Sequence, residues 1–193
     1  ITGATGIAAA TAELFVADSA TVAVLDRDAT NLDALTKKSP AIQTILGDLT
    51  DASTPQEAVD AIIDMHTRLD ILVNVAGISG RKFGDGPVHE ATDAGWDAVI
   101  DTNARAAFAL CRAALGPMMK QGAGAIVNMA SALAYAPAAK HFATHAYAAS
   151  NGARIALTKS MAAYYASHGI RVNAVAPGLI ATPMSARAKG DKA

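Results

Sequence analysis

The chain has 193 residues, of which 52% are hydrophobic and 17% charged, and this composition excludes a disordered or highly solvated polypeptide. Its 16 basic and 17 acidic side chains nearly cancel to a formal net charge of -1, so no basic surface for nucleic acid is indicated. Cys111 is the single cysteine, and no apolar run reaches the roughly 18–20 residues that span a bilayer. We therefore expect one cytoplasmic domain over residues 1–193, with no nucleic acid and no membrane as partners.

Short β-branched segments alternate with longer segments of helical spacing along the chain. Strands are predicted at 21–25, 42–46, 69–75, 125–130 and 170–176. Helices are predicted at 31–38, 55–67, 96–120 (interrupted near Gly116-Pro117) and 147–168. Strands that are apolar on both faces belong to parallel sheets covered by helices on both sides. The pattern predicts a doubly wound parallel α/β sheet in three α/β/α layers, which binds its ligands beyond the carboxyl ends of the strands.

A glycine turn opens the chain, with G-x-x-G-x-x-A spacing from Gly3 through Gly6 to Ala9. Glycines permit a tight turn and a close approach of the backbone to a pyrophosphate, which the N-terminus of the following helix attracts. Taken alone, the same residues also suit a purely structural turn between a strand and a helix.

Asp26 follows Gly6 by 20 positions and ends the next strand, where a dinucleotide-binding fold places a carboxylate for the adenosine ribose. Its charge repels a 2′-phosphate, which favours NAD over NADP. Arg27 is the competing feature, because a guanidinium can hold that phosphate. Alternatively, both are solvated loop charges. Asp48 and Leu49 end the third strand and can flank the adenine.

The sequence resembles the short-chain dehydrogenase/reductase family in an ordered set of segments. They are the Thr2–Ile7 turn, Asn74–Gly77, Asn103, Ile126–Ser131, Tyr147–Asn151, Arg171–Gly178 and Thr182. The resemblance implies a Rossmann-type fold, a nicotinamide cofactor and hydride exchange between an alcohol and a ketone. It also implies a domain incomplete at both ends, lacking the start of its first strand and its last strand.

The resemblance assigns the catalytic roles. Tyr147 is the acid/base, Ser131 hydrogen-bonds the substrate carbonyl, Asn103 holds a water chain that relays protons, and Asn151 stands where the family has lysine. The implied cofactor-binding residues are Gly3, Thr5, Gly6, Ile7, Asp26, Arg27, Asp48, Leu49, Asn74, Ala76, Gly77, Tyr147, Asn151, Pro177, Gly178, Ile180 and Thr182. No metal is expected, because His141 and His145 have i, i+4 spacing but lie in a loop without a third ligand.

Asn151 is the departure from the family with the largest chemical consequence. A lysine four residues after Tyr147 would share its helix face, and a cation there lowers the pKa of a phenol. Asparagine supplies hydrogen bonds but no charge. Arg154, seven positions after Tyr147, can bend back and replace that cation in part, although an interface or surface arginine is the interpretation we favour. The glycine turn is also one residue shorter than the common form of the family.

We therefore expect an NAD(P)-dependent alcohol dehydrogenase or ketone reductase. One alternative is a catalytically impaired dinucleotide-binding protein with a sensing or assembly role, and another is a sugar-nucleotide epimerase, which the short chain disfavours. The loop between Ser131 and Tyr147 carries Leu133, Tyr135, Pro137 and Phe142, which suggest a partly hydrophobic substrate. The alanine-rich helices at 96–115 and 147–168 form a dimer bundle in the family, so a homodimer or homotetramer is expected unless both helix faces are buried against the sheet.

Overall fold

The computed structural model describes residues 1–136 and 142–189. The strands in this part of the chain run parallel. β1 (Ala23–Asp26) pairs with β2 (Gln43–Leu46), and β4 (Gly124–Met129) pairs with β3 (Ile71–Asn74) on one side and β5 (Ile170–Val175) on the other. Thr2 connects the two groups of strands through parallel bridges to Leu25 and Asn74. The predicted parallel sheet is thereby confirmed; β4 has the expected length but begins one residue earlier, and the other strands are one to three residues shorter than expected.

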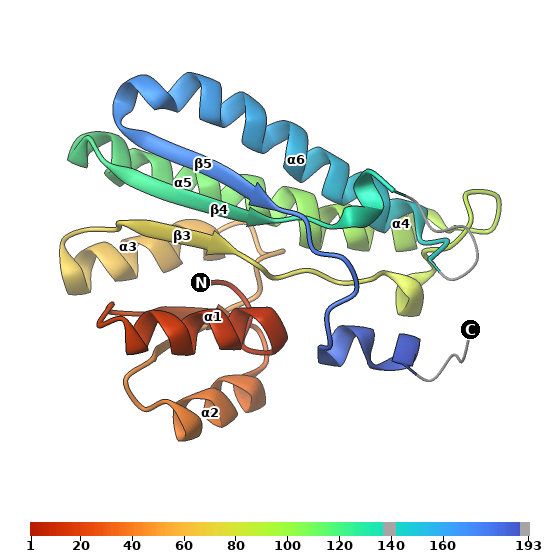
Figure 1. Cartoon of the computed structure of the whole chain (residues 1–193), viewed down its shortest axis with the longest axis horizontal. Coiled ribbons are helices and arrows are strands. Elements are labelled where there is room, and N and C mark those ends of the chain that lie inside the picture. The colour runs from red at the N-terminus through yellow and green to blue at the C-terminus, as the bar shows by residue number, and fades with distance from the viewer. Residues whose placement is uncertain (137–141, 190–193) are drawn as a thin grey trace.

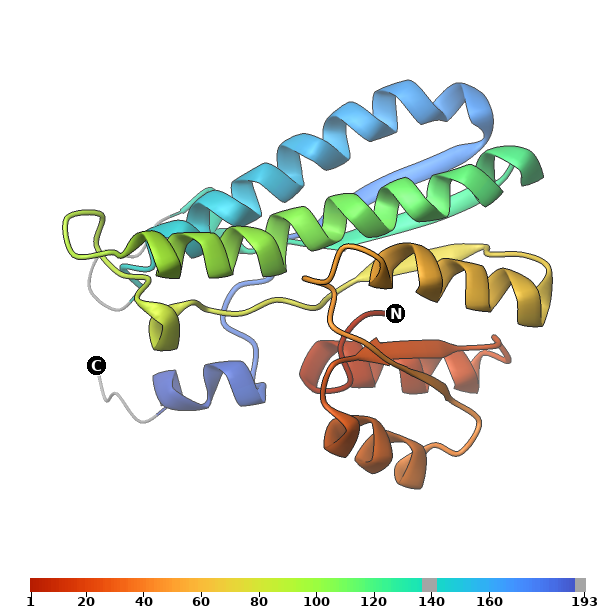
Figure 2. The ribbon, with the colours of Figure 1, turned by 180° about the vertical axis from the view of Figure 1, so that it is seen from behind.

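Helices cover both faces of this sheet. Helices α3 (Thr54–His66), α5 (Ala106–Gln121) and α6 (His145–Tyr165) lie on the face seen in Figure 2. Helix α1 (Gly6–Ala17) lies on the opposite face, in front of the strands in Figure 1, and α2 (Ala29–Lys38) packs against β1 and β2. The three-layer architecture expected from the alternating pattern is confirmed.

Two apolar clusters hold the layers together. In the larger one, Cys111 and Met118 of α5 pack against Ile126 of β4 and Ile170 of β5, all at most 1% exposed. In the smaller one, α1 and α2 pack on β1 through the residues Ala4, Ala12, Val22, Val24, Leu32, Leu35 and Ile42. Small side chains such as alanine allow a helix to lie close to a sheet. Because the interior is closely packed, the carboxyl ends of the strands are held in fixed positions, and residues at these ends can form a site.

The long helix expected over 96–120 is interrupted at a different place from the one predicted. Helix α4 (Asp93–Val99) passes into a π-helical turn, η2 (Ile100–Arg105), before α5 begins. Pro117 lies inside α5, which continues to Gln121, so the predicted break at Gly116-Pro117 is wrong. The fully buried Met118 anchors the turn that the proline would otherwise weaken. A π-helical turn often marks a functional position, and this one contains Asn103.

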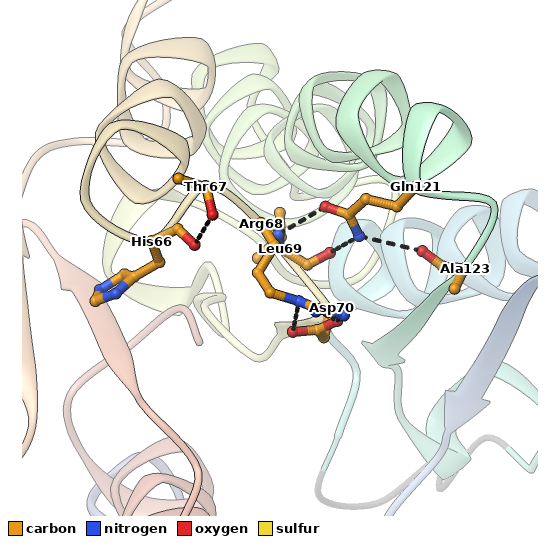
Figure 3. A network of polar contacts seen from close by, with 7 residues as sticks. All are labelled: His66, Thr67, Arg68, Leu69, Asp70, Gln121 and Ala123. Carbon is orange, nitrogen blue, oxygen red and sulfur yellow. Dashed lines mark hydrogen bonds and ion pairs between the residues drawn. The ribbon is translucent and has the colours of Figure 1, made fainter.

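The amino ends of β3 and β4 are held together by Gln121, at the end of α5 (Figure 3). Its Oε1 accepts a hydrogen bond from the N–H of Leu69 at 2.9 Å, and its Nε2 donates to the carbonyls of Leu69 at 3.0 Å and Ala123 at 3.4 Å. The neighbouring Arg68 and Asp70 form an exposed ion pair at 2.6 Å. These contacts fasten the turn after α3 to the end of α5.

Every helix within residues 1–136 and 142–189 falls short of the combined length and apolar character that a membrane-spanning segment requires.

Candidate functional site

A cavity of about 460 Å³ lies beyond the carboxyl ends of the strands. Its walls come from the glycine turn, the ends of β1, β3 and β4, the start of α6 and the segment after β5. The structure brings all the predicted catalytic and cofactor-binding residues to this cavity, with the exception of Asn74. Residues scattered over the whole sequence therefore meet at one edge of the sheet, as a parallel α/β fold requires.

Asn74 lies in the sheet and is only 1% exposed. Its Nδ2 donates to Oδ1 of Asn128 at 2.8 Å and to Sγ of Cys111 at 3.3 Å, and Asn128 in turn donates to Oγ1 of Thr158 at 2.9 Å. The side chain thus ties β3 to β4 beneath the cavity. Its Oδ1 has no hydrogen-bond partner among the described residues.

The glycine turn forms one end of the cavity. Gly3 and Gly6 have φ values of +92° and +55°, which favour glycine, and a Cβ at Gly6 would lie 3.2 Å from the side chain of Thr182. Helix α1 begins directly after Thr5, whose side chain makes no capping hydrogen bond. The first N–H groups of α1 therefore face the cavity without a side-chain cap, an arrangement that attracts an anion.

Asp26 connects the end of β1 to this turn. Its Oδ2 accepts a hydrogen bond from the N–H of Ala4 at 2.7 Å, and its Oδ1 accepts one from the N–H of Asp28 at 2.9 Å. A carboxylate has about four lone-pair sites, so both oxygens retain capacity for the hydroxyl groups of a ribose. The sequence predicted a contact of Asp26 with the ribose but not its hydrogen bond to the glycine turn.

Arg27 is paired with Asp48, and both residues line the cavity. Its Nη1 lies 3.4 Å from Oδ2 of Asp48, and the two side chains are 53% and 34% exposed. Burial acts to raise the pKa of the Asp48 carboxyl, but hydrogen bonds from Thr50 and the charge of Arg27 together lower it below its usual value. An exposed pair of this kind costs little to separate.

These features fit a dinucleotide. The turn has glycines where a side chain would crowd its neighbours, the helix N-terminus lacks a side-chain cap, and the Asp26 carboxylate stands at the end of the adjacent strand. Each matches the part of a dinucleotide that a Rossmann-type fold binds there.

Tyr147 is the third residue of α6 and lines the other end of the cavity. The start of the helix is held by Asp85, a residue that is 7% exposed. The Asp85 carboxylate accepts hydrogen bonds from the N–H groups of Ala146 and Tyr147, both at 3.0 Å. Sequence reasoning missed Asp85, because nothing local indicates that its partners lie about sixty positions away.

Ser131 follows β4 and lines the same cavity as the glycine turn. Its Oγ accepts a hydrogen bond from the N–H of Leu133 at 3.2 Å. The hydroxyl proton remains available for donation, because a serine hydroxyl is both a donor and an acceptor. Ser131 can therefore donate to an oxygen atom in the cavity.

The side chain of Asn103, in η2, connects the loop after β3 to α6 through hydrogen bonds. Its Oδ1 accepts from the N–H of Ile78 at 2.8 Å, and its Nδ2 donates to the carbonyl of Ile78 at 3.0 Å and to Oγ of Ser150 at 3.1 Å. A Cβ at Gly77 would lie 3.0 Å from the same Oδ1. Both the oxygen and the nitrogen of the Asn103 side-chain amide are therefore hydrogen-bonded to protein groups. The backbone carbonyl of Asn103 accepts a hydrogen bond from Nε of Arg154 at 2.6 Å, and the water relay at this residue stays a prediction.

Asn151 lines the cavity but turns its amide back onto its own helix. Its Nδ2 donates to the carbonyl of Tyr147 at 2.8 Å, and the residue is 2% exposed. The position therefore supplies no charge to the phenol, as the sequence predicts.

The interpretation of Arg154 as a surface or interface residue is wrong, because it is only 4% exposed. Its Nε, Nη1 and Nη2 donate to the backbone carbonyls of Asn103, Met129 and Ala76, each at 2.6 Å. Burial lowers the pKa of Arg154 to about 10, and the nearby Tyr147 and Cys111 act against this shift. Seven positions are about two helical turns, which places Arg154 on the inward face that also carries Tyr147.

The loop between Ser131 and Tyr147 contributes to the cavity only in part. Leu133 and Phe142 line it, whereas Tyr135 is 63% exposed and is not among the lining residues. Pro137 and His141 lie outside the described residues. Nδ1 of His145 accepts a hydrogen bond from the N–H of Val88 at 3.1 Å. Within residues 1–136 and 142–189, no three His, Cys, Asp or Glu side chains come together as metal ligands.

Further lining residues come from segments next to the predicted motifs. Ser79 and Arg81 follow Gly77, Thr102 precedes Asn103, and Met184 follows Thr182. Their closeness in sequence to motif residues is the signal that would have identified them.

Comparisons with known proteins agree with this geometry. The family model described as short chain dehydrogenase matches residues 1–193. The chain is 38% identical over 191 residues to 2-(R)-hydroxypropyl-CoM dehydrogenase of Xanthobacter autotrophicus, covering 96% of this chain and 75% of that one. It resembles the crystal structure of levodione reductase with a TM-score of 0.89 and 31% identity, over 97% of this chain and 73% of that one. A variant of actinorhodin polyketide ketoreductase, crystallised with NADPH, resembles this chain with a TM-score of 0.89 and 30% identity, over 98% of this chain and 72% of that one.

Proposed function

Since this chain belongs to the short-chain dehydrogenase family, we propose that it is an NAD(P)-dependent oxidoreductase that interconverts a secondary alcohol and a ketone. The observation that carries the proposal is a single cavity that contains the glycine turn at one end and Ser131 and Tyr147 at the other. A dinucleotide site and a proton donor are the two parts that such a reaction needs.

The cofactor would be held by the glycine turn, the N-terminus of α1 and Asp26. NAD is the preferred form in this proposal, because the Asp26 carboxylate repels a 2′-phosphate and Arg27 is already paired with Asp48. The NADPH in the structure of the actinorhodin ketoreductase belongs to that protein, and its presence makes the cofactor preference the first property to measure.

The bound nicotinamide supplies or accepts the hydride. In the direction of reduction, Ser131 Oγ–H donates a hydrogen bond to the carbonyl oxygen, where negative charge develops. Tyr147 then delivers the phenolic proton to that oxygen, and its phenolate regains a proton from solvent. In the reverse direction the phenolate of Tyr147 takes the proton of the alcohol. Asp85 orients the phenol by holding the first turn of α6.

The substrate proposed is a partly hydrophobic carbonyl compound. Leu133, Phe142 and Met184 line the cavity, and apolar walls favour a substrate that buries hydrocarbon surface there.

We also propose a cytoplasmic homodimer or homotetramer that assembles through α5 and the adjoining helices. Trp96 and Phe108 are each 46% exposed, and Tyr164 of α6 is 67% exposed. Large apolar side chains on neighbouring helices favour association. Cys111 is buried as a free thiol, which suits a reducing compartment. Light scattering in solution tests the assembly.

The test of the proposed function is the consumption of NADH and of NADPH by the full-length protein with a panel of ketones. Tyr147→Phe should lower kcat by several orders of magnitude while NADH fluorescence still reports binding, and Ser131→Ala should lower kcat by about 10²–10³. Absence of turnover with every ketone, alongside tight NADH binding, would instead favour a dinucleotide-binding protein without catalysis.

A further inference from the structure

Arg154 is a buried cation without a carboxylate partner among the described residues. Its three hydrogen bonds go to backbone carbonyls, which carry only partial charge. An isolated buried charge is unfavourable, so a full positive charge in this position calls for a negative group nearby. Three of the five N–H donors of the guanidinium are engaged, which leaves two for another partner.

The guanidinium cannot move to a different partner at low cost. Ala76 follows β3, Met129 ends β4 and Asn103 belongs to η2, so the three carbonyls come from separate segments that converge on one point. Each bond measures 2.6 Å, and hydrogen bonds from a charged donor are shorter and stronger than those between neutral groups. Arg154 is therefore held in place before any ligand arrives.

Arg154 and Tyr147 project from the same face of α6 into the same cavity. Asn151 lies between them on that face, but its amide is turned to the carbonyl of Tyr147. The other charged or titratable groups that the structure describes near Tyr147 are Asp85, which accepts a hydrogen bond from its N–H, His145 two residues before it, and Arg81, which also lines the cavity. Of the three residues of α6 that line the cavity, Tyr147, Asn151 and Arg154, only Arg154 carries a positive charge.

We propose that Arg154 is the electrostatic partner of Tyr147, supplying from the next turn of α6 the positive charge that the neutral Asn151 lacks. The inference rests on the proposed function, and Arg154 acts through Tyr147 instead of touching the substrate. The coupling between the two groups is mutual, because the tyrosine acts to raise the pKa of Arg154 against the effect of burial. A cation near the phenolate favours proton abstraction from an alcohol at neutral pH.

The first experiment compares Arg154→Lys, Arg154→Gln and Arg154→Met in the pH profile of kcat/KM for alcohol oxidation. The Gln and Met variants lose the charge, so the acidic limb of their kcat/KM profile should shift to higher pH by about one unit or more. At neutral pH this shift lowers kcat/KM at least tenfold. The Lys variant should keep most of the parent profile. If kcat/KM falls in all three variants while the acidic limb stays at the same pH, Arg154 has only a structural role and the proposal is overturned.

The second experiment places a lysine at position 151. Asn151→Lys should raise the neutral-pH rate in the Arg154→Gln background, where it restores the charge. In the parent it should lower the rate, because a second cation then crowds Arg154. Equal gains in both backgrounds would show that Arg154 does not serve Tyr147.

A third measurement is independent of turnover. The alkaline absorbance of tyrosinate is recorded for the cofactor-free protein and for Tyr147→Phe, and the difference reports the ionisation of Tyr147 alone. The step should move to higher pH when the same pair of measurements is made in the Arg154→Gln background, where the cation is missing. A step that stays at the same pH would refute the proposal. If only the proposed function is wrong, the protein will show no turnover, but the ionisation step of Tyr147 will still behave as expected.

Discussion

Asp85 and Tyr147 are joined by a hydrogen bond of 3.0 Å from the backbone N–H of the tyrosine to the carboxylate, although 62 positions separate them in the chain. The loop that carries Asp85 is fitted closely to its surroundings, since a Cβ at Gly80 would overlap Asp85 and Val99. The cap residue of α6, Thr144, makes no side-chain hydrogen bond of its own. The position of the phenol therefore depends on a distant loop.

Asp85→Ala should lower both the stability and the turnover of the protein. It removes the acceptor of two N–H groups at the start of α6, which corresponds to about 1–2 kcal/mol of unfolding free energy. The rate should fall further than this loss of stability explains, because Tyr147 is displaced. Urea denaturation and steady-state kinetics measure the two effects, and Asp85→Asn should recover part of each.

Asp28→Ala is the matched control for Asp85. Asp28 caps α2 by accepting a hydrogen bond from the N–H of Thr30 at 2.9 Å, so the substitution removes an acidic cap at a helix that does not carry Tyr147. It should cost about 1 kcal/mol of stability and leave kcat close to that of the parent. Equal losses of kcat in the two variants would argue against a specific role for Asp85.

Asp26→Asn should shift the cofactor preference toward NADP(H). The amide retains an acceptor for one of the two N–H groups bound by Asp26 but loses the charge that repels a 2′-phosphate. Arg27 can then leave its exposed partner Asp48 and bind the phosphate. The ratio of the Kd values of NADPH and NADH, measured by fluorescence, should fall about tenfold, equivalent to about 1.4 kcal/mol.

Asp18→Asn provides the comparison for cofactor choice. Asp18 is exposed beyond the end of α1, so its substitution changes the net charge equally without touching the turn. It should leave the NADPH to NADH ratio near the parent value. Tighter binding of NADPH than of NADH by the unmodified protein would contradict the role given to Asp26.

The stability of the protein should fall between pH 9 and 11 through Cys111. Burial raises the pKa of this thiol from its usual value of 9.0 to about 11. Between these values the folded protein keeps a proton that the unfolded chain has released, so the stabilising contribution is complete below pH 9 and is lost as the pH approaches 11. The loss amounts to about 2–3 kcal/mol at most.

Cys111→Ser isolates this contribution, because serine keeps a polar group beside Asn74 and Asn128 but does not ionise in this range. Urea denaturation at several pH values should give curves for the two proteins that converge as the pH rises from 9 to 11. Parallel curves over that range would assign the alkaline instability to other groups.

Gln121→Met should destabilise the fold without altering the cavity. The substitution keeps the length of the side chain but leaves the N–H and carbonyl of Leu69 without their partner, which costs about 1–2 kcal/mol. Arg68→Gln removes the exposed ion pair with Asp70 next to it and should have a much smaller effect. A larger loss of stability from Arg68→Gln than from Gln121→Met would reverse the importance assigned to the two contacts.

The sequence alone predicted the fold class and about half of the residues that line the cavity. Runs of β-branched residues and the glycine turn act through local backbone preferences, so β1 to β5 lie within one to two residues of the predicted segments or inside them. The parallel sheet then brings the ends of these segments to one edge. This is why Gly6, Asp26, Ser131 and Tyr147, which the sequence predicts as site residues, line one cavity in the structure.

The helix break and the environment of Arg154 were decided only by the tertiary structure. Proline chemistry at Pro117 predicted a local break, but η2 forms earlier, where Asn103 is held by Ile78 and Ser150. Helical periodicity placed Arg154 in line with Tyr147, yet its carbonyl partners lie 25, 51 and 78 positions away in the chain. Whether a charge is buried, and what compensates it, depends on which distant segments pack around it, and no local pattern records that.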